Sequence, residues 1–530
     1  MRTEWGEAAR RFAPALLGLL LGVLALWPAL GPGFVLRYDM VFVPDPPLVL
    51  PGQGFPRAVP SDLVVALLSR VVPAEAVQKA FLLGIFVLAA SGAAALVPSR
   101  RLGPRLVAAA FYAWNAYLAQ RLLLGQWALL LGVAGLPWAV RAVCLGGRLR
   151  LAAALVPAAV GGFQAMLVSA VAVLATAATA PAPAPVTRAR RTGEAALIMG
   201  GLSLPWLVPA LLSGATTDPA GVDAFAARAD GPFGVAGSLL GLGGIWNAHA
   251  TVPGQYSWWS AGVRLALAAV AVWGFVRLRA AGRGGRSRTE DGGVPYWTGL
   301  AVAAGAGLGV ACLGAFAPGL LKALVGWWPG FGTIRDGQLH LAPFALLQAV
   351  GLATAADRWT ARPVAAPRAV AAVAVAVPVL VLPTFALGAF GRLAAVPYPQ
   401  EWRRVQEIVN GDPAPGALLS LPWGAHRAFG WNGGRVVLDP ATKLFGRRVI
   451  WNDELLVGLP GGGRIRVAAE DPLAAKAGAA LRTGAEDRVR ALARLGVRYV
   501  LTRPSDNTFQ DALTVFEGPE LRLIRLDSPL

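Results

Sequence analysis

The composition of this 530-residue chain excludes an ordinary soluble enzyme. Hydrophobic residues make up 56% of it and charged residues only 15%, against about 45–50% and about 25% in typical globular chains. A chain with so few polar residues could not cover the surface of a soluble fold. A disordered chain is also excluded, because disorder requires low hydrophobicity. The chain is therefore expected to be a multi-pass membrane protein. Its 2 cysteines and 3 histidines form no metal-binding pattern.

Nine apolar runs are suited to crossing a bilayer, and a tenth run, 151–180, is ambiguous. In chain order the nine are 12–30, 81–97, 106–119, 127–143, 195–212, 260–275, 297–317, 341–356 and 370–390. The run 106–119 is short for a lone span, which predicts a helix tucked inside a bundle. The ambiguous run is long for one span and short for two.

Arginine clusters resolve this ambiguity, because they flank the runs in one consistent cytoplasmic set under the positive-inside rule. Its members include Arg2, Arg10, Arg11, Arg100, Arg101, Arg105, Arg141, Arg148, Arg150, Arg188, Arg190, Arg191, Arg277, Arg279, Arg358 and Arg368. The set requires an even number of crossings between Arg150 and Arg188, so 151–180 is predicted to be a short helical hairpin. The prediction is an all-α polytopic bundle of about 11 spans in the cytoplasmic membrane, with the N-terminus inside.

The formal net charge of +19 does not indicate a nucleic-acid partner. Most of the basic excess falls in the cytoplasmic set, where it directs topology and attracts lipid headgroups. Membrane lipids are therefore expected partners, and nucleic acid is not.

Residues 392–530 change character and predict a small extracytoplasmic α/β domain after the transmembrane domain, residues 1–391. No run in this part could span a bilayer. The expected elements are strands at 417–421, 435–438, 497–502 and 521–526, a hairpin turn at Asn432-Gly433 and a helix at 486–495 that Gly496 ends.

Three long outer loops, 31–75, 213–259 and 319–338, carry the candidate functional residues. Binding and catalytic groups gather in such loops on a rigid scaffold. The first loop holds Arg37, Asp39, Asp45 and Asp62, and the third holds Arg335 and Asp336.

A first span followed closely by an acidic residue in a long outer loop resembles the GT-C superfamily of membrane glycosyltransferases. Four segments are similar to those of bacterial GT-C-like proteins, including arabinofuranosyltransferase-like proteins: YAWNAY at 112–117, RLLLGQW at 121–127, LPW at 136–138 and GTIRDG at 332–337. The external domain fits as well. The resemblance implies a polyprenyl-phosphate-linked sugar donor and a glycan or glycolipid acceptor of the cell envelope.

Such a transfer needs a carboxylate to take the acceptor proton and a cation to steady the leaving phosphate. Under the resemblance, Asp39 is the expected general base because it lies nearest the outer end of the first span. Asp45 and Asp62 are alternates. Substrate-binding roles are expected for Arg37, Asp62, Arg121, Gln126, Arg335 and Asp336.

Some members of the superfamily use a second acidic residue to hold a divalent cation. No adjacent acidic pair occurs in the first outer loop. Whether the protein binds a divalent cation therefore stays open, with Asp45 as the candidate ligand. No other cofactor is expected.

Simpler interpretations stand beside these. Asp39 and Arg37 could form a solvated interfacial loop, and Arg121 with Gln126 could be an interfacial anchor. His426 is expected to cap or pack in a turn of the external domain. A transporter or flippase of a lipid-linked sugar and a non-catalytic envelope-assembly protein also stay open. Polar residues gather at the outer face and no internal repeat is obvious, which favours the enzyme.

Overall fold

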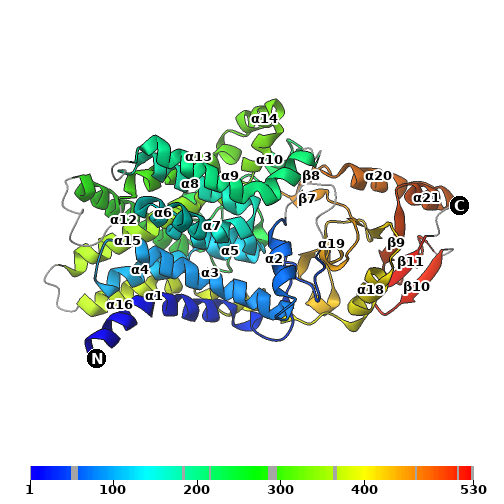
Figure 1. The fold of residues 1–530 in the computed structure, drawn as a ribbon, viewed down its shortest axis with the longest axis horizontal. Coiled ribbons are helices and arrows are strands. Elements are labelled where there is room, and N and C mark those ends of the chain that lie inside the picture. The colour runs from blue at the N-terminus through cyan, green and yellow to red at the C-terminus, as the bar shows by residue number, and fades with distance from the viewer. Residues whose placement is uncertain are drawn as a thin grey trace.

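The computed structural model describes residues 2–48, 58–181, 186–213, 217–283, 295–361, 367–459, 462–509 and 512–526. The molecule is elongated, with a helical bundle in one half and an α/β domain in the other (Figure 1). The N-terminus lies at the far end of the bundle, and the C-terminal strands lie at the opposite end of the molecule.

The bundle consists of long apolar helices joined by short elements. Its main helices are α1 (Arg2–Leu26), α3 (Ala74–Leu96), α4 (Leu102–Ala113), α5 (Ala116–Leu123), α6 (Trp127–Leu145), α7 (Arg148–Gly161), α8 (Phe163–Thr179), α9 (Arg188–Leu212), α12 (Trp258–Arg283), α13 (Trp297–Phe316), α15 (Ala342–Thr360) and α16 (Pro367–Val381). The connections contain β1 (Phe34–Val35), α2 (Ser61–Leu68), α10 (Gly221–Ala224), α11 (Gly234–Leu240), η2 (Ala248–Ala250), α14 (Pro318–Trp327), η3 (Pro329–Ile334), η4 (Gly337–Leu341) and α17 (Ala386–Gly391).

Among the described residues, 7 helices are long and apolar enough to cross a membrane, or up to 8 if the bent pair Arg368–Val381 and Pro383–Gly391 forms one span. The chain is therefore a multi-pass membrane protein. The predicted count of about 11 spans is not confirmed, because α4, α5 and α7 are shorter than the roughly 17–25 residues that a crossing needs, and α8 only reaches the lower limit.

The apolar run 106–119 is not one helix, which corrects the sequence-based prediction. The chain breaks at Trp114 and Asn115, where the Asn115 side chain accepts a hydrogen bond from the Leu118 N–H and caps α5. The same side chain donates to the carbonyls of Phe111 and Tyr112 at the end of α4. One side chain thus ends one helix and begins the next.

Residues 151–180 form a helical hairpin, as predicted. α7 and α8 meet at Gly162, which has a φ of +76°. Both pack against α6, where Gly135 faces Pro157 and Gly132 faces Ala165. The helices have 14 and 17 residues. At about 1.5 Å per residue they are roughly 21 and 25 Å long, shorter than a hydrocarbon core of about 30 Å.

The C-terminal domain is built on a five-stranded mixed sheet in the order β10-β11-β9-β3-β6. Its strands are β3 (Ala417–Ser420), β6 (Val449–Ile450), β9 (Val497–Thr502), β10 (Leu513–Glu517) and β11 (Arg522–Arg525). β3 lies parallel to β6 and β9, and β11 lies antiparallel to β9 and β10. The helices are α18 (Gln400–Gly411), α19 (Ala441–Leu444), α20 (Pro472–Ala480) and α21 (Ala485–Arg494). The α/β class predicted for this part is confirmed.

Three two-stranded ladders complete the fold. They are β1 with β2 (Ala395–Val396), β4 (His426–Ala428) with β5 (Val436–Leu438), and β7 (Leu455–Gly458) with β8 (Arg464–Val467). The first ladder joins the outer end of α1 to the start of the α/β domain. The two halves of the molecule are therefore connected by backbone pairing and not only by the chain.

α12 and α15 cross at very short range because both carry glycine at the crossing. A Cβ atom on Gly351 would lie 1.9 Å from the Ala271 carbonyl oxygen, and one on Gly274 would lie 2.1 Å from the Gly351 carbonyl oxygen. The span that contains α15 has 94% of its apolar window buried. This crossing therefore fixes the centre of the bundle.

We expect Gly351→Ala to destabilise the bundle by about 1–3 kcal/mol, because overpacking a close contact forces the backbones apart. The measurement is thermal unfolding of the purified protein in detergent. Gly305→Ala in α13 is the matched control, since a Cβ atom there meets nothing within 4 Å. Equal melting temperatures for the two variants would contradict the close crossing.

Candidate active site

The first outer loop carries Asp39 and is held from two sides. On the external-domain side, the Tyr38 N–H donates to the Val436 carbonyl and the Leu438 N–H donates to the Tyr38 carbonyl, each at 2.8 Å. On the bundle side, the Asp39 N–H donates to the Leu124 carbonyl at 3.2 Å. The position of the Asp39 backbone is therefore set by both halves of the molecule.

Gly125 allows this loop to reach the bundle. It has a φ of +84°, and a Cβ atom there would lie 2.3 Å from both the Arg37 carbonyl oxygen and the Met40 nitrogen. Only glycine permits such an approach without moving a backbone. The glycine of the RLLLGQW segment is thus explained by contact with the Asp39 loop.

The Asp39 carboxylate is 49% exposed, and its contacts with the residues that the structure describes are long. Gln126 Nε2 lies 3.5 Å from Oδ2, and His426 Nε2 lies 4.0 Å from Oδ1. A carboxylate with open access and weak contacts can accept a proton from an incoming hydroxyl.

A buried ion pair lies behind Gln126. Arg121 donates to both carboxylate oxygens of Asp336, at 2.6 and 2.8 Å, and also to Gln126 Oε1 at 2.8 Å. The Arg121 side chain is 0% exposed and that of Asp336 is 13% exposed. Gln126 therefore joins Asp39 to this pair, and four of the residues singled out in the sequence meet in one group.

Arg37 lies beside this group but is bonded to backbone carbonyls. It donates to the carbonyls of Leu123 and His249, each at 2.8 Å. Burial, against an opposing effect of Tyr38 and together with the positive charges of Arg392 and Arg435, lowers the pKa of its guanidinium to about 10. Arg37 stays protonated at neutral pH and ties the first outer loop to the second.

The remaining sequence candidates lie elsewhere. Arg335 donates to Glu470 at 2.9 Å and stacks over Phe225 at 4.9 Å. Asp62 accepts from Lys443 of α19 at 2.9 Å. Both therefore join the outer loops to the external domain, and neither contacts the Asp39 group through these bonds.

The described residues do not supply a metal centre. No group of three or more His, Cys, Asp or Glu side chains gathers in the part of the chain that the structure describes. Asp45 is exposed, and its recorded bond is through its backbone carbonyl, to Gln406 Nε2 at 3.0 Å. These residues do not fit a divalent cation as ligands, so they supply no metal for a reaction at Asp39.

His426 was missed by the sequence analysis. The expectation that it would lie in a turn is wrong, because it lies in strand β4. Its ring packs edge-on against Tyr38, as expected of a packing role, but it also faces Asp39. No local signal could have placed it there, since the contact joins residues 39 and 426 through space. The only hint was the Asn432-Gly433 turn, which predicts a hairpin next to the histidine.

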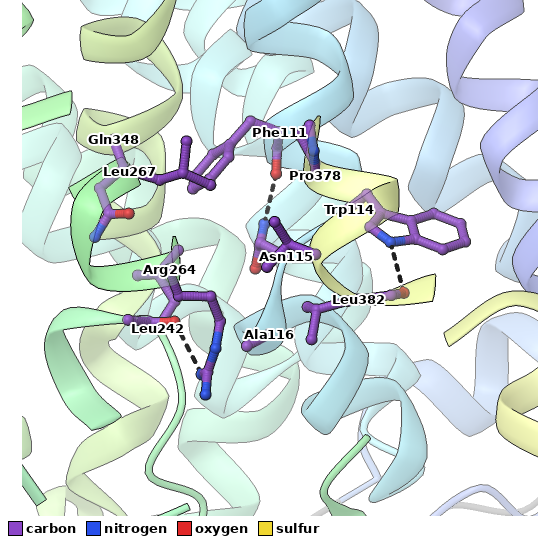
Figure 2. A pocket seen from close by; sticks show the side chains of 12 residues that line it. Phe111, Trp114, Asn115, Ala116, Leu242, Arg264, Leu267, Gln348, Pro378 and Leu382 are labelled. Atoms are coloured by element: carbon purple, nitrogen blue, oxygen red, sulfur yellow. Dashed lines mark hydrogen bonds between the residues drawn. The ribbon is translucent and has the colours of Figure 1, made fainter. Parts of the chain in front are cut away.

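A separate small and partly open pocket lies between the α4–α5 break and helices α12, α15 and α16 (Figure 2). Its walls are mostly apolar, and they include Phe111, Trp114, Leu267 and Leu382. Arg264 provides a guanidinium there, 3.8 Å from the buried Asp230 carboxylate. An arginine within a predicted span is a functional-site signal by default, so the sequence could have identified it.

Asp230 connects this pocket to the Asp39 group. Its Oδ2 accepts from Gln120 Nε2 at 2.7 Å and from Gln255 Nε2 at 2.8 Å. Gln120 is the chain neighbour of Arg121 in α5. The second outer loop is therefore fastened to α5 by a buried carboxylate.

Comparison with known proteins identifies the fold. No sequence profile of a known family and no curated protein matches the chain. The structure is similar to that of arabinofuranosyltransferase AftD from Mycobacteria, with a TM-score of 0.52 and 16% identity over 98% of this chain and 40% of that protein. A mutant of that enzyme gives a TM-score of 0.52 over 98% of this chain and 41% of the mutant chain, again at 16% identity.

An oligosaccharyltransferase from Archaeoglobus fulgidus is more distant. Its TM-score is 0.39 at 12% identity, over 93% of this chain and 68% of that protein, and we base no argument on it. The present chain spans about two-fifths of the length of the mycobacterial arabinofuranosyltransferase. The likeness to that enzyme, together with the apolar helices and the C-terminal α/β domain, means that the chain has the fold of the GT-C membrane glycosyltransferases.

Proposed function

We propose that the protein transfers a sugar from a polyprenyl-phosphate donor to a cell-envelope glycan or glycolipid at the outer membrane face. The observation that carries the proposal is the half-exposed Asp39 carboxylate at the junction of the bundle and the external domain. It lies beside Gln126, which accepts a bond from Arg121. The GT-C fold supports glycosyl transfer as the kind of reaction, and the donor and acceptor classes follow from the sequence resemblance.

In the proposed reaction, the acceptor hydroxyl attacks the anomeric carbon of the donor sugar. Its proton passes to Asp39 as the new bond to the sugar forms. The sugar–phosphate bond breaks, and its electron pair leaves with the phosphate.

The proposal places the external domain and the outer loops outside the cytoplasm. The arginine clusters support this orientation through the positive-inside rule. The start of α1, with Arg10 and Arg11, lies at the end of the bundle away from the α/β domain (Figure 1). The acceptor would then approach Asp39 from the external side.

We expect a reporter that is active only in the cytoplasm to be silent when fused after Leu530. The same reporter inserted next to Arg100 and Arg101 should be active, which controls for expression. The measurement is reporter activity in intact cells. A strong cytoplasmic signal at the C-terminus would reverse the proposed orientation.

We expect Asp39→Asn to insert and fold normally but to lose about 10²–10⁴ in transfer rate, because a general base is removed while a surface substitution costs within about 0.5 kcal/mol of stability. The measurement is transfer of radiolabelled sugar from polyprenyl-phospho-sugars by purified protein. Glu407→Gln is the control, since Glu407 is 68% exposed on α18. Wild-type rates in Asp39→Asn would remove Asp39 from the mechanism, and an inactive wild type would favour an assembly role.

We expect Gly125→Ala to reduce transfer through displacement of the Asp39 loop, by roughly 10²-fold for a misplacement near 1 Å. Gly146→Ala is the matched control. Gly146 also has a positive φ, +75°, but a Cβ atom there meets nothing within 4 Å. Transfer rates and melting temperatures of both variants separate the loop effect from general destabilisation, and equal rates would refute the contact.

A further inference from the structure

His426 lies beside Asp39, although it belongs to the external domain. Its Nε2 is 4.0 Å from Asp39 Oδ1, and its side chain is 25% exposed. Its ring meets the Tyr38 ring edge-on, with the centroids 6.1 Å apart. The imidazole and the carboxylate therefore face the same accessible space at the junction.

Backbone pairing fixes this approach. His426 pairs with Leu438 in the β4–β5 ladder, and the Leu438 N–H donates to the Tyr38 carbonyl. Tyr38 precedes Asp39 in the chain, so the two side chains are held by a short series of hydrogen bonds. Catalytic hydrogen bonds are often long before substrate binds and shorten in the complex, so 4.0 Å suits a contact that closes during the reaction.

The surrounding charges leave the imidazole as the group suited to exchange a proton with Asp39. The charge of Arg121 in α5 interacts with that of Asp39, and Arg121 is itself paired with Asp336. Arg427, the next residue in β4, pairs at 2.7 Å with the buried Asp439. Tyr38 is the remaining titratable neighbour of the ring. Imidazole is the side chain whose ordinary pKa, about 6.5, lies near neutrality.

We infer that His426 is a positioning and proton-relay residue for Asp39, an inference that rests on the proposed function. After Asp39 has taken the proton of the acceptor hydroxyl, neutral His426 accepts that proton at Nε2 and releases it to water. The carboxylate is thereby restored for the next transfer. A His426 that is already protonated cannot accept the proton and instead pairs with Asp39.

We expect His426→Gln to lower kcat by about tenfold or more, by analogy with other proton-transfer groups, with KM for donor and acceptor unchanged. Added imidazole should restore part of the rate in His426→Ala. His249→Gln is the control. His249 is exposed, and its hydrogen bonds to other described residues are made by its backbone and not by its ring.

The outcomes separate the relay from the proposed function. Full activity in Asp39→Asn overturns the proposed function and the relay with it. Loss of activity in Asp39→Asn, together with wild-type kcat in His426→Gln and no effect of imidazole on His426→Ala, overturns the relay alone.

A second measurement does not depend on activity or on the folding of a histidine variant. Diethyl pyrocarbonate modifies neutral imidazole, and mass spectrometry can follow its reaction with His426 at neutral pH. The rate of modification should change in Asp39→Asn, because the charge beside Nε2 is lost. An unchanged rate contradicts the coupling between the two side chains.

Discussion

The pairing of the first outer loop with the external domain is the constraint on which the candidate site depends. Phe34 and Val35 pair with β2, and Tyr38 bonds to β5. From the bundle side, the Gln78 amide bonds both to the N–H and to the carbonyl of Val35. A buried loop must satisfy its backbone polar groups, and here two domains share that task. Asp39 is consequently held by contacts that neither domain makes alone.

This constraint explains why polar side chains of the external domain donate hydrogen bonds to the loop. Tyr398 donates to the Phe42 carbonyl at 3.0 Å, and Gln406 donates to the carbonyls of Pro44 and Asp45. Phe42 and Pro44 are buried, and a buried carbonyl without a partner costs about 1–3 kcal/mol. The loop is therefore held by the α/β domain as well as by the bundle, even though it follows α1 directly in the chain. Removal of that domain would leave the Asp39 segment without its bonds to Val436, Leu438 and Tyr398.

The sequence predicted the features that depend on local pattern. Apolar length and arginine position predicted the membrane bundle and the hairpin around Gly162, and strand signals predicted β3 and β9. What it missed depends on contacts between distant segments. Asn115 divides an apolar run by capping α5, which hydrophobicity cannot reveal. The partners of Arg335 and Asp39, Glu470 and His426, lie more than a hundred residues away, so their approach could be known only from the folded chain.

The two carboxylates of this group illustrate how environment assigns different roles to one kind of side chain. Asp336 forms a bidentate pair with a fully buried guanidinium, and breaking such a pair typically costs 3–5 kcal/mol. Asp336 cannot release Arg121 to a substrate without that cost. The contribution of Asp336 is therefore to hold α5 and the third outer loop together. Among the residues that the structure describes, no cation pairs with Asp39 in this way, and its carboxylate is half exposed. The Arg121–Asp336 pair is formally neutral and rigid, whereas the exposed carboxylate keeps the freedom to exchange a proton that catalysis requires.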